Sequence, residues 1–305
     1  MRNEILNLLK KENKISNEAA EEFSNAEIEG FTNIVKELGE EKTDYIDREK
    51  IIKNFESELF KNIYVYKEVM STNTVSKFLA EQGIENNTVV ISEKQTKGRG
   101  RSGKKWESPL GGVWLSLIIR PQIDQTKASL ITLATGVAVA NTIRSFDIDN
   151  VEIKWPNDIL IDGKKVSGIL TEAIAKLNSI NYIVIGVGID VNFDNEDMSD
   201  ELKELTISLS KAAGKKIEEV NVIKRFLIEF EKIFIDFEEE KYEDILKEWR
   251  KQSFSIGKYV RIKQLFGNNF DGYIIGINKE GALIVEKADG TLEKVISGEF
   301  DIIND

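Results

Sequence analysis

Residues 88–119 read TVVISEKQTKGRGRSGKKWESPLGGVWLSLII, and this stretch decides the fold of the chain. It begins and ends with β-branched, apolar segments, 88–92 and 113–119, which are typical of strands. The loop between them interleaves glycines with cations: Gly98, Arg99, Gly100, Arg101, Gly103, Lys104 and Lys105. Glycine lets a backbone approach a ligand closely, and guanidinium groups bind carboxylate or phosphate. The sequence therefore predicts an anion-binding loop between two strands.

Two nucleotide-binding motifs nearly match this loop. The spacing of Gly98, Gly100 and Gly103 fits the dinucleotide fingerprint G-x-G-x-x-G. It also fits a P-loop up to its last position, where Lys105 stands in place of the hydroxyl residue. Both motifs need a helix directly after the glycines, whereas Pro109 and the glycine pair after it interrupt any helix. A kinase glycine-rich loop is excluded because its catalytic H-R-D needs a histidine, which the chain lacks.

Composition removes several classes of chemistry. The chain has 305 residues, no Cys and no His, and a net charge of −11. These absences exclude disulfides, a thiolate nucleophile, zinc sites with the usual ligands and a Ser-His-Asp triad. Reactions must then depend on positioning and charge stabilisation by Lys, Arg, carboxylates, hydroxyls and amides. With no visible signal peptide, no apolar run as long as a membrane span and an acidic balance, we expect a soluble cytoplasmic protein.

The pattern along the chain predicts three parts. Residues 1–62 are read as short amphipathic helices, and residues 253–305 as four short strands between regularly spaced glycines, a pattern typical of a small barrel. Residues 63–252 mix both types of element. Strands are expected near 63–67, 88–92, 113–119, 151–154 and 181–185 and around a hairpin turn at Asp162-Gly163, and helices near 71–82, 128–146 and 218–250.

Three further clusters accompany the basic loop. The triplet Ser71-Thr72-Asn73 reads as a helix cap whose spare polar groups can face a pocket. The K-W-P-N-D segment at 154–158 places a cation, an amide and a carboxylate at a strand end, although alone it could be a turn with a packed Trp. Lys164 and Lys165 are neighbours on a strand, so one points to each face and one of them can enter a site.

Together these motifs resemble the biotin protein ligase family. The resemblance rests on S-T-N, G-R-G-R-x-G-x-x-W, K-W-P-N-D, K-V-S-G-I-L and G-V-G-I in the family's order, and it covers about Ile63 to the end. It implies an α/β (α+β) protein whose catalytic domain is a mixed-sheet, class II synthetase-like fold. We place this domain at 63–252, after a small helical, degenerate winged-helix-like domain at 1–62 and before a small antiparallel β-barrel at 253–305.

The resemblance also implies a reaction and its residues. Biotin and ATP, with Mg²⁺, would form biotinyl-5′-adenylate, which then acylates a lysine of a biotin carboxyl carrier domain. Biotin would be bound by Ser71, Thr72, Asn73, Gln95, Arg99, Gly100, Arg101 and Lys165. The nucleotide would be bound by Arg99, Arg101, Trp106, Lys154, Asn157 and Gly168. Lys165, Arg101 and Asp158 would be catalytic, and the metal ligands are left unassigned.

Two departures from the family pattern matter. Asp190 stands where the family's G-x-G-I-N motif has Asn, and an acid there could repel an adenylate or help to hold magnesium. The N-terminal part is acidic: residues 1–60 contain 9 Lys and Arg against 15 Asp and Glu, and the segment 26–38, in the position of a recognition helix, is acidic as well. Since phosphate contacts dominate DNA affinity, we expect no DNA binding by this part.

Other functions remain as alternatives. The first is a bifunctional ligase that is also a DNA-binding biotin operon repressor. The second is a lipoate-type ligase, although the G-G-G-x-V-x-H-D stretch of that family is missing here. A third is a binding protein of the same fold without activity. Family members often pair through the catalytic sheet, so the resemblance also allows a homodimer, while it places no part of the chain in a membrane.

Overall fold

The computed structural model describes residues 43, 45–53, 55, 57–176, 179–193, 200–264 and 268–303. Most of the predicted N-terminal helices, including the segment 26–38, lie outside the described residues. Within the described part, the short helix α3 (Arg48–Ile52) precedes the first strand. It contacts both α8 and β1, and its Ile51 is fully buried in the main core. The predicted domain boundary after residue 62 stays a prediction.

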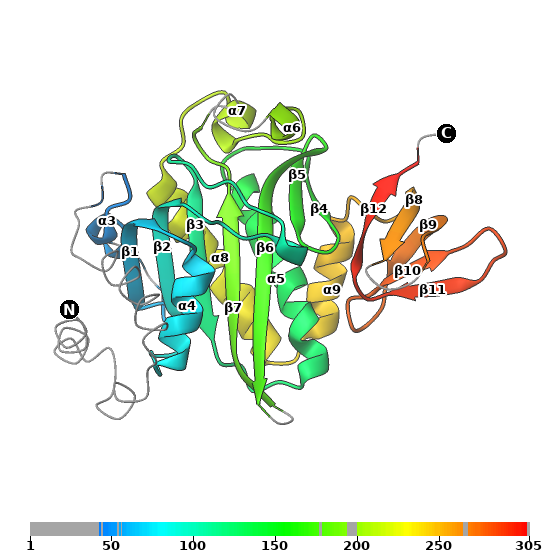
Figure 1. Ribbon diagram of the computed structural model, residues 1–305, viewed down its shortest axis with the longest axis horizontal. Helices are drawn as coiled ribbons and strands as arrows, with labels where there is room; N and C mark the ends of the chain where they lie inside the picture. Colours follow the sequence, from blue (N-terminus) through cyan, green and yellow to red (C-terminus); the bar gives the residue numbers. More distant parts are fainter. Residues whose placement is uncertain are drawn as a thin grey trace.

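A mixed seven-stranded sheet forms the centre of the molecule (Figure 1). Its order is β1-β2-β3-β7-β6-β5-β4, and only β1 and β2 are parallel. The strands are β1 (Asn62–Val69), β2 (Thr88–Gln95), β3 (Val113–Ile119), β4 (Val151–Lys154), β5 (Asp158–Ile161), β6 (Lys164–Lys176) and β7 (Ser179–Ile189). Every strand predicted in this region is present, and β3 follows the basic loop, as the rejection of the nucleotide motifs required.

The hairpin between β5 and β6 turns at the predicted pair. Asp162 and Gly163 have φ of 50° and 77°, and two positive φ values define the turn whose twist suits a two-residue hairpin. This turn fixes the register in which Lys165 lies beside Leu160. The side chain of Lys164 is exposed, whereas Lys165 lies in a cavity, so the two lysines do face opposite sides.

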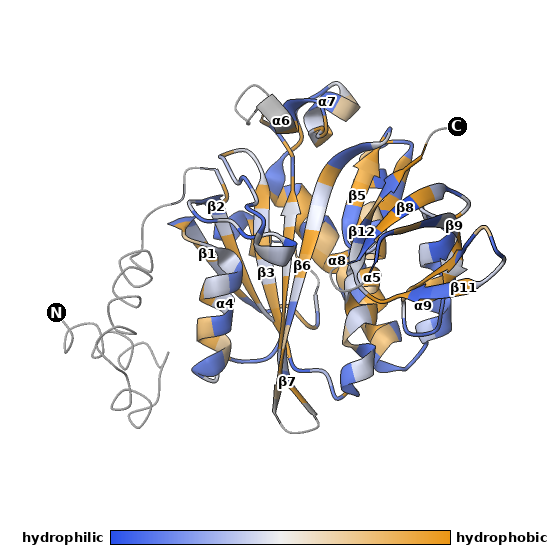
Figure 2. Ribbon diagram, turned by 45° about the vertical axis from the view of Figure 1, so that its right-hand side comes forward, coloured by the Kyte–Doolittle hydropathy of each residue, from blue (hydrophilic) through white to orange (hydrophobic). Residues whose placement is uncertain are grey.

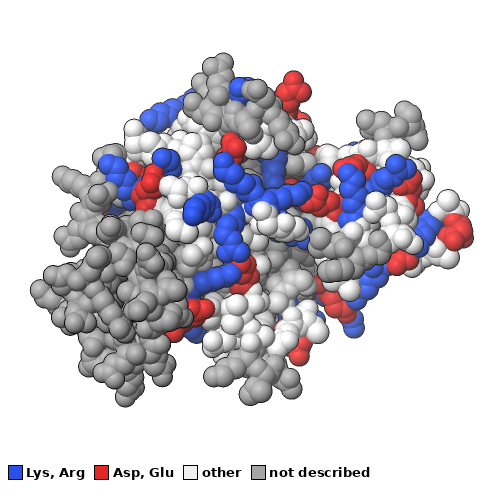
Figure 3. Space-filling view, in the orientation of Figure 1, with Lys and Arg blue, Asp and Glu red and all other residues white. Residues whose placement is uncertain are grey.

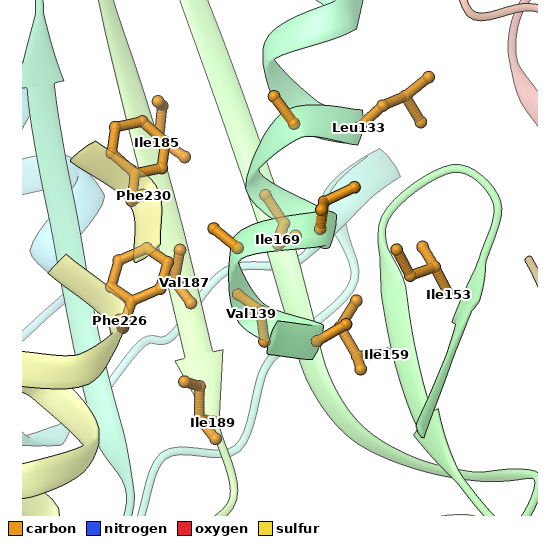
Figure 4. Packing of buried hydrophobic residues seen from close by; sticks show 14 of the residues in the cluster. Leu133, Val139, Ile153, Ile159, Ile169, Ile185, Val187, Ile189, Phe226 and Phe230 are labelled. Atoms are coloured by element: carbon orange, nitrogen blue, oxygen red, sulfur yellow. The ribbon is translucent and has the colours of Figure 1, made fainter. Parts of the chain in front are cut away.

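Helices cover both faces of this sheet (Figures 1 and 2). On one face α4 (Thr72–Glu81) packs on Val90, Ile118 and Val184. The opposite face carries α5 (Ala128–Arg144) and α8 (Glu219–Glu238), which pack on the alternate residues of the same strands. Figure 4 shows Ile185, Val187 and Ile189 of β7 against Phe226 and Phe230 of α8. The strands are apolar on both sides because both faces are covered.

The structure has two helices where the sequence predicted one. The sequence predicted a continuous helix over 218–250, but α8 ends at Glu238 and α9 begins at Tyr242 (Tyr242–Lys251). Glu240, between them, has φ of 59°, a left-handed conformation that no α-helix contains. Short helices or turns complete this region: α6 (Asp200–Lys203), α7 (Leu209–Ala213), and the 3₁₀ turns η2 (Arg101–Gly103) and η3 (Gln125–Lys127).

The C-terminal part is an antiparallel sheet of five strands, so the predicted number of four is wrong. The order is β11-β10-β9-β8-β12, from β8 (Tyr259–Gln264), β9 (Phe270–Ile277), β10 (Leu283–Glu286), β11 (Leu292–Val295) and β12 (Gly298–Ile302). Trp155 fastens it to the central sheet: its indole Nε1 donates to the Gly281 carbonyl at 3.0 Å, and its backbone N–H donates to Ser255 Oγ at 3.1 Å. Trp155 is thus a packed tryptophan at a domain junction.

Within the part of the chain that the structure describes, no helix has the length and apolarity needed to cross a membrane.

Candidate active site

A cavity of about 310 Å³ lies on the α4 face of the central sheet. Every residue that the sequence analysis assigned to a site lines it: Ser71, Thr72, Asn73, Gln95, Arg99, Gly100, Arg101, Trp106, Lys154, Asn157, Asp158, Lys165 and Gly168. Its floor is hollow because β3, β6 and β7 each place small residues on this face, namely Ser116, Gly168, Gly186 and Gly188. Lys and Arg gather across the middle of this side of the molecule (Figure 3).

One end of the cavity, here called the α4 end, consists of the lining residues Ser71, Thr72, Asn73 and Gln95 together with Ser116 and Glu172, which hydrogen-bond to them. Thr72 donates from its backbone N–H to Gln95 Oε1 at 2.8 Å, and its hydroxyl lies 2.7 Å from the Ser116 hydroxyl. The Ser116 hydroxyl also lies 2.7 Å from Asn73 Oδ1. Ser71 occupies the N-cap position of α4 but makes no capping bond with its side chain, so its hydroxyl remains available to the cavity. The amides and hydroxyls of this end are thus held in fixed orientations.

Glu172 of β6 completes the α4 end. Its carboxylate accepts from Asn73 Nδ2 at 2.9 Å and from Arg99 NH2 at 3.1 Å, and it is paired with the Lys77 ammonium. Burial by itself would raise the pKa of Glu172, but the hydrogen bonds from Lys77 and Asn73 and the charges of Lys77 and Arg99 outweigh it and lower the pKa. The carboxylate is therefore ionised.

The other end, here called the tryptophan end, consists of Trp106, Lys165, Gly168, Gly188 and Asp190. The Trp106 ring lies against two glycines: a Cβ on Gly168 would stand 2.8 Å from Trp106 Cζ3, and one on Gly188 would stand 2.5 Å from Trp106 Nε1. The indole Nε1 is buried and has no hydrogen-bond partner among the described residues. A flat aromatic face that closes a cavity suits a flat heterocycle.

Two of the predicted catalytic residues, Lys165 and Asp158, are in contact beside the tryptophan end. Lys165 Nζ lies 2.7 Å from Asp158 Oδ1 and 5.0 Å from the centre of the Trp106 ring. Both charged side chains are partly buried, at 31% and 25% exposure. The ion pair keeps the ammonium inside the cavity in the absence of a ligand, at the point where a new negative charge would be stabilised.

Arg101 projects from the basic loop onto the turn between β4 and β5. Its NH1 donates to Asn157 Oδ1 at 3.0 Å, and Asn157 in turn donates from Nδ2 to the Ile169 carbonyl at 3.0 Å. Burial lowers the pKa of Arg101, and the carboxylates of Asp158 and Glu299 partly offset this effect. Among the described residues, its guanidinium hydrogen-bonds only to a neutral amide, so an anionic ligand would be a better partner.

Asp190 is the residue that departs from the family motif. It is 1% exposed, and neither carboxylate oxygen has a hydrogen-bond partner among the described residues. Burial raises the pKa of Asp190 well above its usual range, and the positive charge of Lys165 offsets this only partly. A buried carboxyl group without partners is costly, so this position is expected to find one when the cavity is filled.

The C-terminal sheet closes one side of the cavity. Glu299, Phe300 and Asp301 of β12 line it. Lys104 of the basic loop is paired with Glu299, and Lys154 Nζ lies 5.0 Å from the centre of the Phe300 ring. The loop therefore touches both sheets.

Sequence reasoning missed Glu172, Ser116, Gly186 and Glu299 as parts of this site. One signal was available for the first: Gly168, Leu170 and Glu172 are spaced by two along β6, and all three therefore face the α4 side. No pattern in the sequence indicates that Ser116 or Gly186 lies under Asn73, because that contact depends on how α4 packs on the sheet.

Comparisons with known proteins point to the same family as the sequence motifs. The model of the "Biotin/lipoate A/B protein ligase family" matches residues 65–190, and that of the "Biotin protein ligase C terminal domain" matches residues 255–302. The "Bifunctional ligase/repressor BirA" of Bacillus subtilis (strain 168) is 40% identical over 240 residues, which cover 78% of this chain and 73% of that protein. The chain belongs to the biotin protein ligase family.

Other members of the biotin protein ligase family agree with this assignment. The "Biotin--[acetyl-CoA-carboxylase] ligase" of Mycobacterium tuberculosis is 28% identical over 233 residues, covering 74% of this chain and 84% of that protein. The biotin protein ligase of Aquifex aeolicus, solved in complex with biotin and ATP, is 27% identical with a TM-score of 0.69, covering 81% of this chain and all of that one. Sequence and structure thus confirm both the family and the α/β fold class that the motifs predicted.

Proposed function

We propose that the cavity joins biotin to ATP and transfers the biotinyl group to a lysine of a biotin carboxyl carrier domain. The observation that carries this proposal is that one cavity collects the S-T-N turn, the basic loop, the K-W-P-N-D turn and Lys165. Family membership supplies the reaction, since this chain is a biotin ligase that uses ATP. The cytoplasm is the proposed location.

The α4 end would hold the biotin ring system. A small, rigid and uncharged head group needs donors and acceptors in fixed positions, and Thr72, Asn73 and Gln95 are oriented by Ser116 and by one another. Ser71 would add an unused hydroxyl. The carboxylate of biotin would then extend toward the basic loop, within reach of Gly100 and Arg101, which also line the cavity.

The tryptophan end would hold the nucleotide. Trp106 would pack against the adenine, and Lys154, Asn157 and Arg101 would contact ribose or phosphates. A biotin carboxylate oxygen attacks the α-phosphorus, and the bond to pyrophosphate breaks. Both reactants are anions, so Arg101 and Lys165 would act by neutralising charge and aligning the groups.

The second step needs no nucleophile from this chain. The neutral amine of the carrier lysine attacks the carbonyl carbon of the mixed anhydride, AMP leaves with the bonding electrons, and an amide forms as the nitrogen loses one proton to solvent. Lys165 would stabilise the charge on the departing phosphate, and Asp158, in contact with it, would keep the ammonium oriented. This accounts for a ligase without Cys or His.

The residues present fit a magnesium ion that binds together with the phosphates. No group of three or more His, Cys, Asp or Glu side chains in the described ranges forms a cage of its own. Magnesium in such sites is held by one or two carboxylates plus substrate phosphates, and the cavity offers Asp158 together with Asp190, whose buried carboxylate oxygens have no hydrogen-bond partner within the described ranges. When bound, the ion would supply charge neutralisation at the phosphates.

The decisive test combines the three substrates. Incubation of the protein with ATP, biotin and a carrier domain, followed by intact-mass measurement, should show a biotin-sized gain on one carrier lysine. The same incubation with lipoate in place of biotin should leave the carrier unchanged. A gain with lipoate alone would overturn the proposal in favour of a lipoate-type ligase.

Repression of transcription is the competing function, because related proteins are named ligase/repressor. The acidic residues 1–60 argue against it, since a surface of this charge repels DNA phosphates. We expect no mobility shift of a palindromic biotin operon site at moderate salt, with or without biotin and ATP. A shift that persists at moderate salt would contradict this expectation and favour the bifunctional protein.

A further inference from the structure

Glu172 contacts three side chains beside the cavity, although no motif named it. It lies on β6 with 17% of its side chain exposed, two residues after Leu170, which lines the cavity. One carboxylate contacts three partners from two other elements. They are the Asn73 amide and the Lys77 ammonium of α4, and the Arg99 guanidinium of the basic loop.

Arg99 faces this carboxylate with both of its terminal nitrogens. NH2 lies 3.1 Å from Oε1 and NH1 lies 3.4 Å from Oε2, which is the two-point geometry in which arginine binds a carboxylate. The sequence assigned Arg99 to the ligand, but in the structure its charge is used by the protein itself. Arg101, two residues later, hydrogen-bonds only to the neutral Asn157 among the described side chains and stays available to an anion.

At its start the basic loop is tied to the α4 side of the cavity by two backbone hydrogen bonds, from the Thr96 and Lys97 N–H groups to the Val69 and Met70 carbonyls at 2.9 and 2.8 Å, and beyond Lys97 the Arg99 side chain makes the next contact with that side. The loop is rich in glycine, so ordering it costs conformational entropy that some contact must offset. Its remaining ion pairs are exposed: Lys104 reaches Glu299 of the C-terminal sheet, and Lys105 reaches Glu107 within the loop itself. Exposed pairs of this kind contribute little. The Arg99–Glu172 pair, partly buried and two-pointed, is the stronger attachment.

We propose that Glu172 is a positioning residue that joins the two halves of the biotin site, by orienting the Asn73 amide and by holding the basic loop over the cavity through Arg99. This inference rests on the proposed function. Loss of the pair should loosen the loop and let the adenylate intermediate leave faster. The bond-making step should change little, because Lys165 and Arg101 are untouched.

A double-mutant cycle tests this role against direct ligand contact by Arg99. Glu172→Gln, Arg99→Ala and the double variant are made in the full chain, and the dissociation rate of biotinyl-adenylate is measured for each. We expect each single variant to accelerate release about fivefold, the equivalent of roughly 1 kcal/mol, and the double variant to accelerate it no more than either single one. In Glu172→Gln, which keeps Arg99, Arg101 and Lys165, the rate of pyrophosphate formation at saturating substrates should change by a smaller factor than the rate of adenylate release.

Two further measurements make the test decisive. Lys97→Ala removes an exposed cation that precedes the loop and does not line the cavity, and it should leave the release rate unchanged. Hydrogen exchange of the backbone amides in 96–108, measured on the protein without substrates, should be faster in Glu172→Gln than in the parent. Multiplicative effects in the double variant, or unchanged exchange in Glu172→Gln, would overturn the proposal. If the parent forms no adenylate, the proposed function fails, and the exchange measurement still decides the attachment.

Discussion

The two ends of the cavity contain similar polar groups, but they differ in how completely these groups are hydrogen-bonded. At the α4 end, Asn73, Gln95 and Glu172 all have protein partners. At the tryptophan end, Trp106 Nε1 and both carboxylate oxygens of Asp190 are buried without a hydrogen-bond partner among the described residues. The contrast is clearest for the two carboxyl groups: the pKa of Glu172 is lowered and that of Asp190 is raised.

This difference shows in which part of the site the polar groups already have hydrogen-bond partners without a ligand. A buried polar atom without a partner costs free energy, and such atoms persist in native proteins mainly where a ligand, water or ion supplies the partner. The α4 end is therefore pre-organised for the biotin ring system. The buried polar atoms of the tryptophan end are expected to gain hydrogen-bond partners only when the nucleotide binds. Each prediction below tests one side of this contrast.

The largest effect is expected from two cations that line the cavity, Lys165 and Arg101. Lys165→Ala and Arg101→Ala should each slow adenylation by about a hundredfold or more, because each removes a donor that stabilises the transition state. Pyrophosphate release with biotin and ATP measures this. Lys164→Ala is the matched control, since its exposed side chain lies on the other face of the same strand. Normal pyrophosphate release by either active-site variant would refute its role.

Alanine substitutions at two glycines of β7, Gly186 and Gly188, test the two ends of the cavity separately, because each adds one methyl group at one end. A Cβ on Gly186 would stand 2.0 Å from Asn73 Oδ1, and one on Gly188 would stand 2.5 Å from Trp106 Nε1. We expect Gly186→Ala to raise the KM for biotin about tenfold with a smaller effect on that for ATP, and Gly188→Ala to do the reverse, since about 1.4 kcal/mol of lost binding is tenfold. Steady-state kinetics, with thermal melts to check folding, decide the matter. Equal effects of both variants on both substrates would erase the distinction between the ends.

The smallest effect concerns stability at Asp190. Its pKa in the folded protein is raised above the unfolded value of about 3.9, so the folded state holds the proton more tightly than the unfolded chain does. Stability is therefore lost as pH rises from about 4 through the folded pKa. Asp190→Asn removes this loss and should raise the free energy of unfolding near pH 8 by about 1 kcal/mol or more, with a smaller gain near pH 4.

Urea unfolding at the two pH values measures this change. A gain of the same size at both values, or no gain near pH 8, would mean that Asp190 already has a partner, and the contrast between the two carboxyl groups would disappear. Asp301→Asn is a suitable comparison, because this carboxylate also lines the cavity but is exposed and paired with Lys263.

Prediction from sequence succeeded where local pattern and motif order carry the information. The strands on both sides of the basic loop, the Asp162-Gly163 hairpin and the opposite directions of Lys164 and Lys165 follow from β-branched runs, turn chemistry and strand alternation. The break at Glu240 was not predictable in this way. A glutamate favours helix, and only the packing of α8 and α9 on α5 requires the chain to turn there.

The sequence by itself determined the chemistry of this protein: without His or Cys it must work with Arg, Lys, carboxylates and a glycine-rich backbone, and the order of its motifs identified the family. Only the tertiary structure decided which partners the polar and charged groups of the site have. Arg99 meets a carboxylate 73 positions away, two glycines make room for Asn73 and Trp106, and the Asp190 carboxyl group is buried with no hydrogen-bond partner in the described part of the chain. Local pattern records backbone preferences, whereas burial and hydrogen bonding arise from contacts between residues far apart in the chain, which exist only after folding.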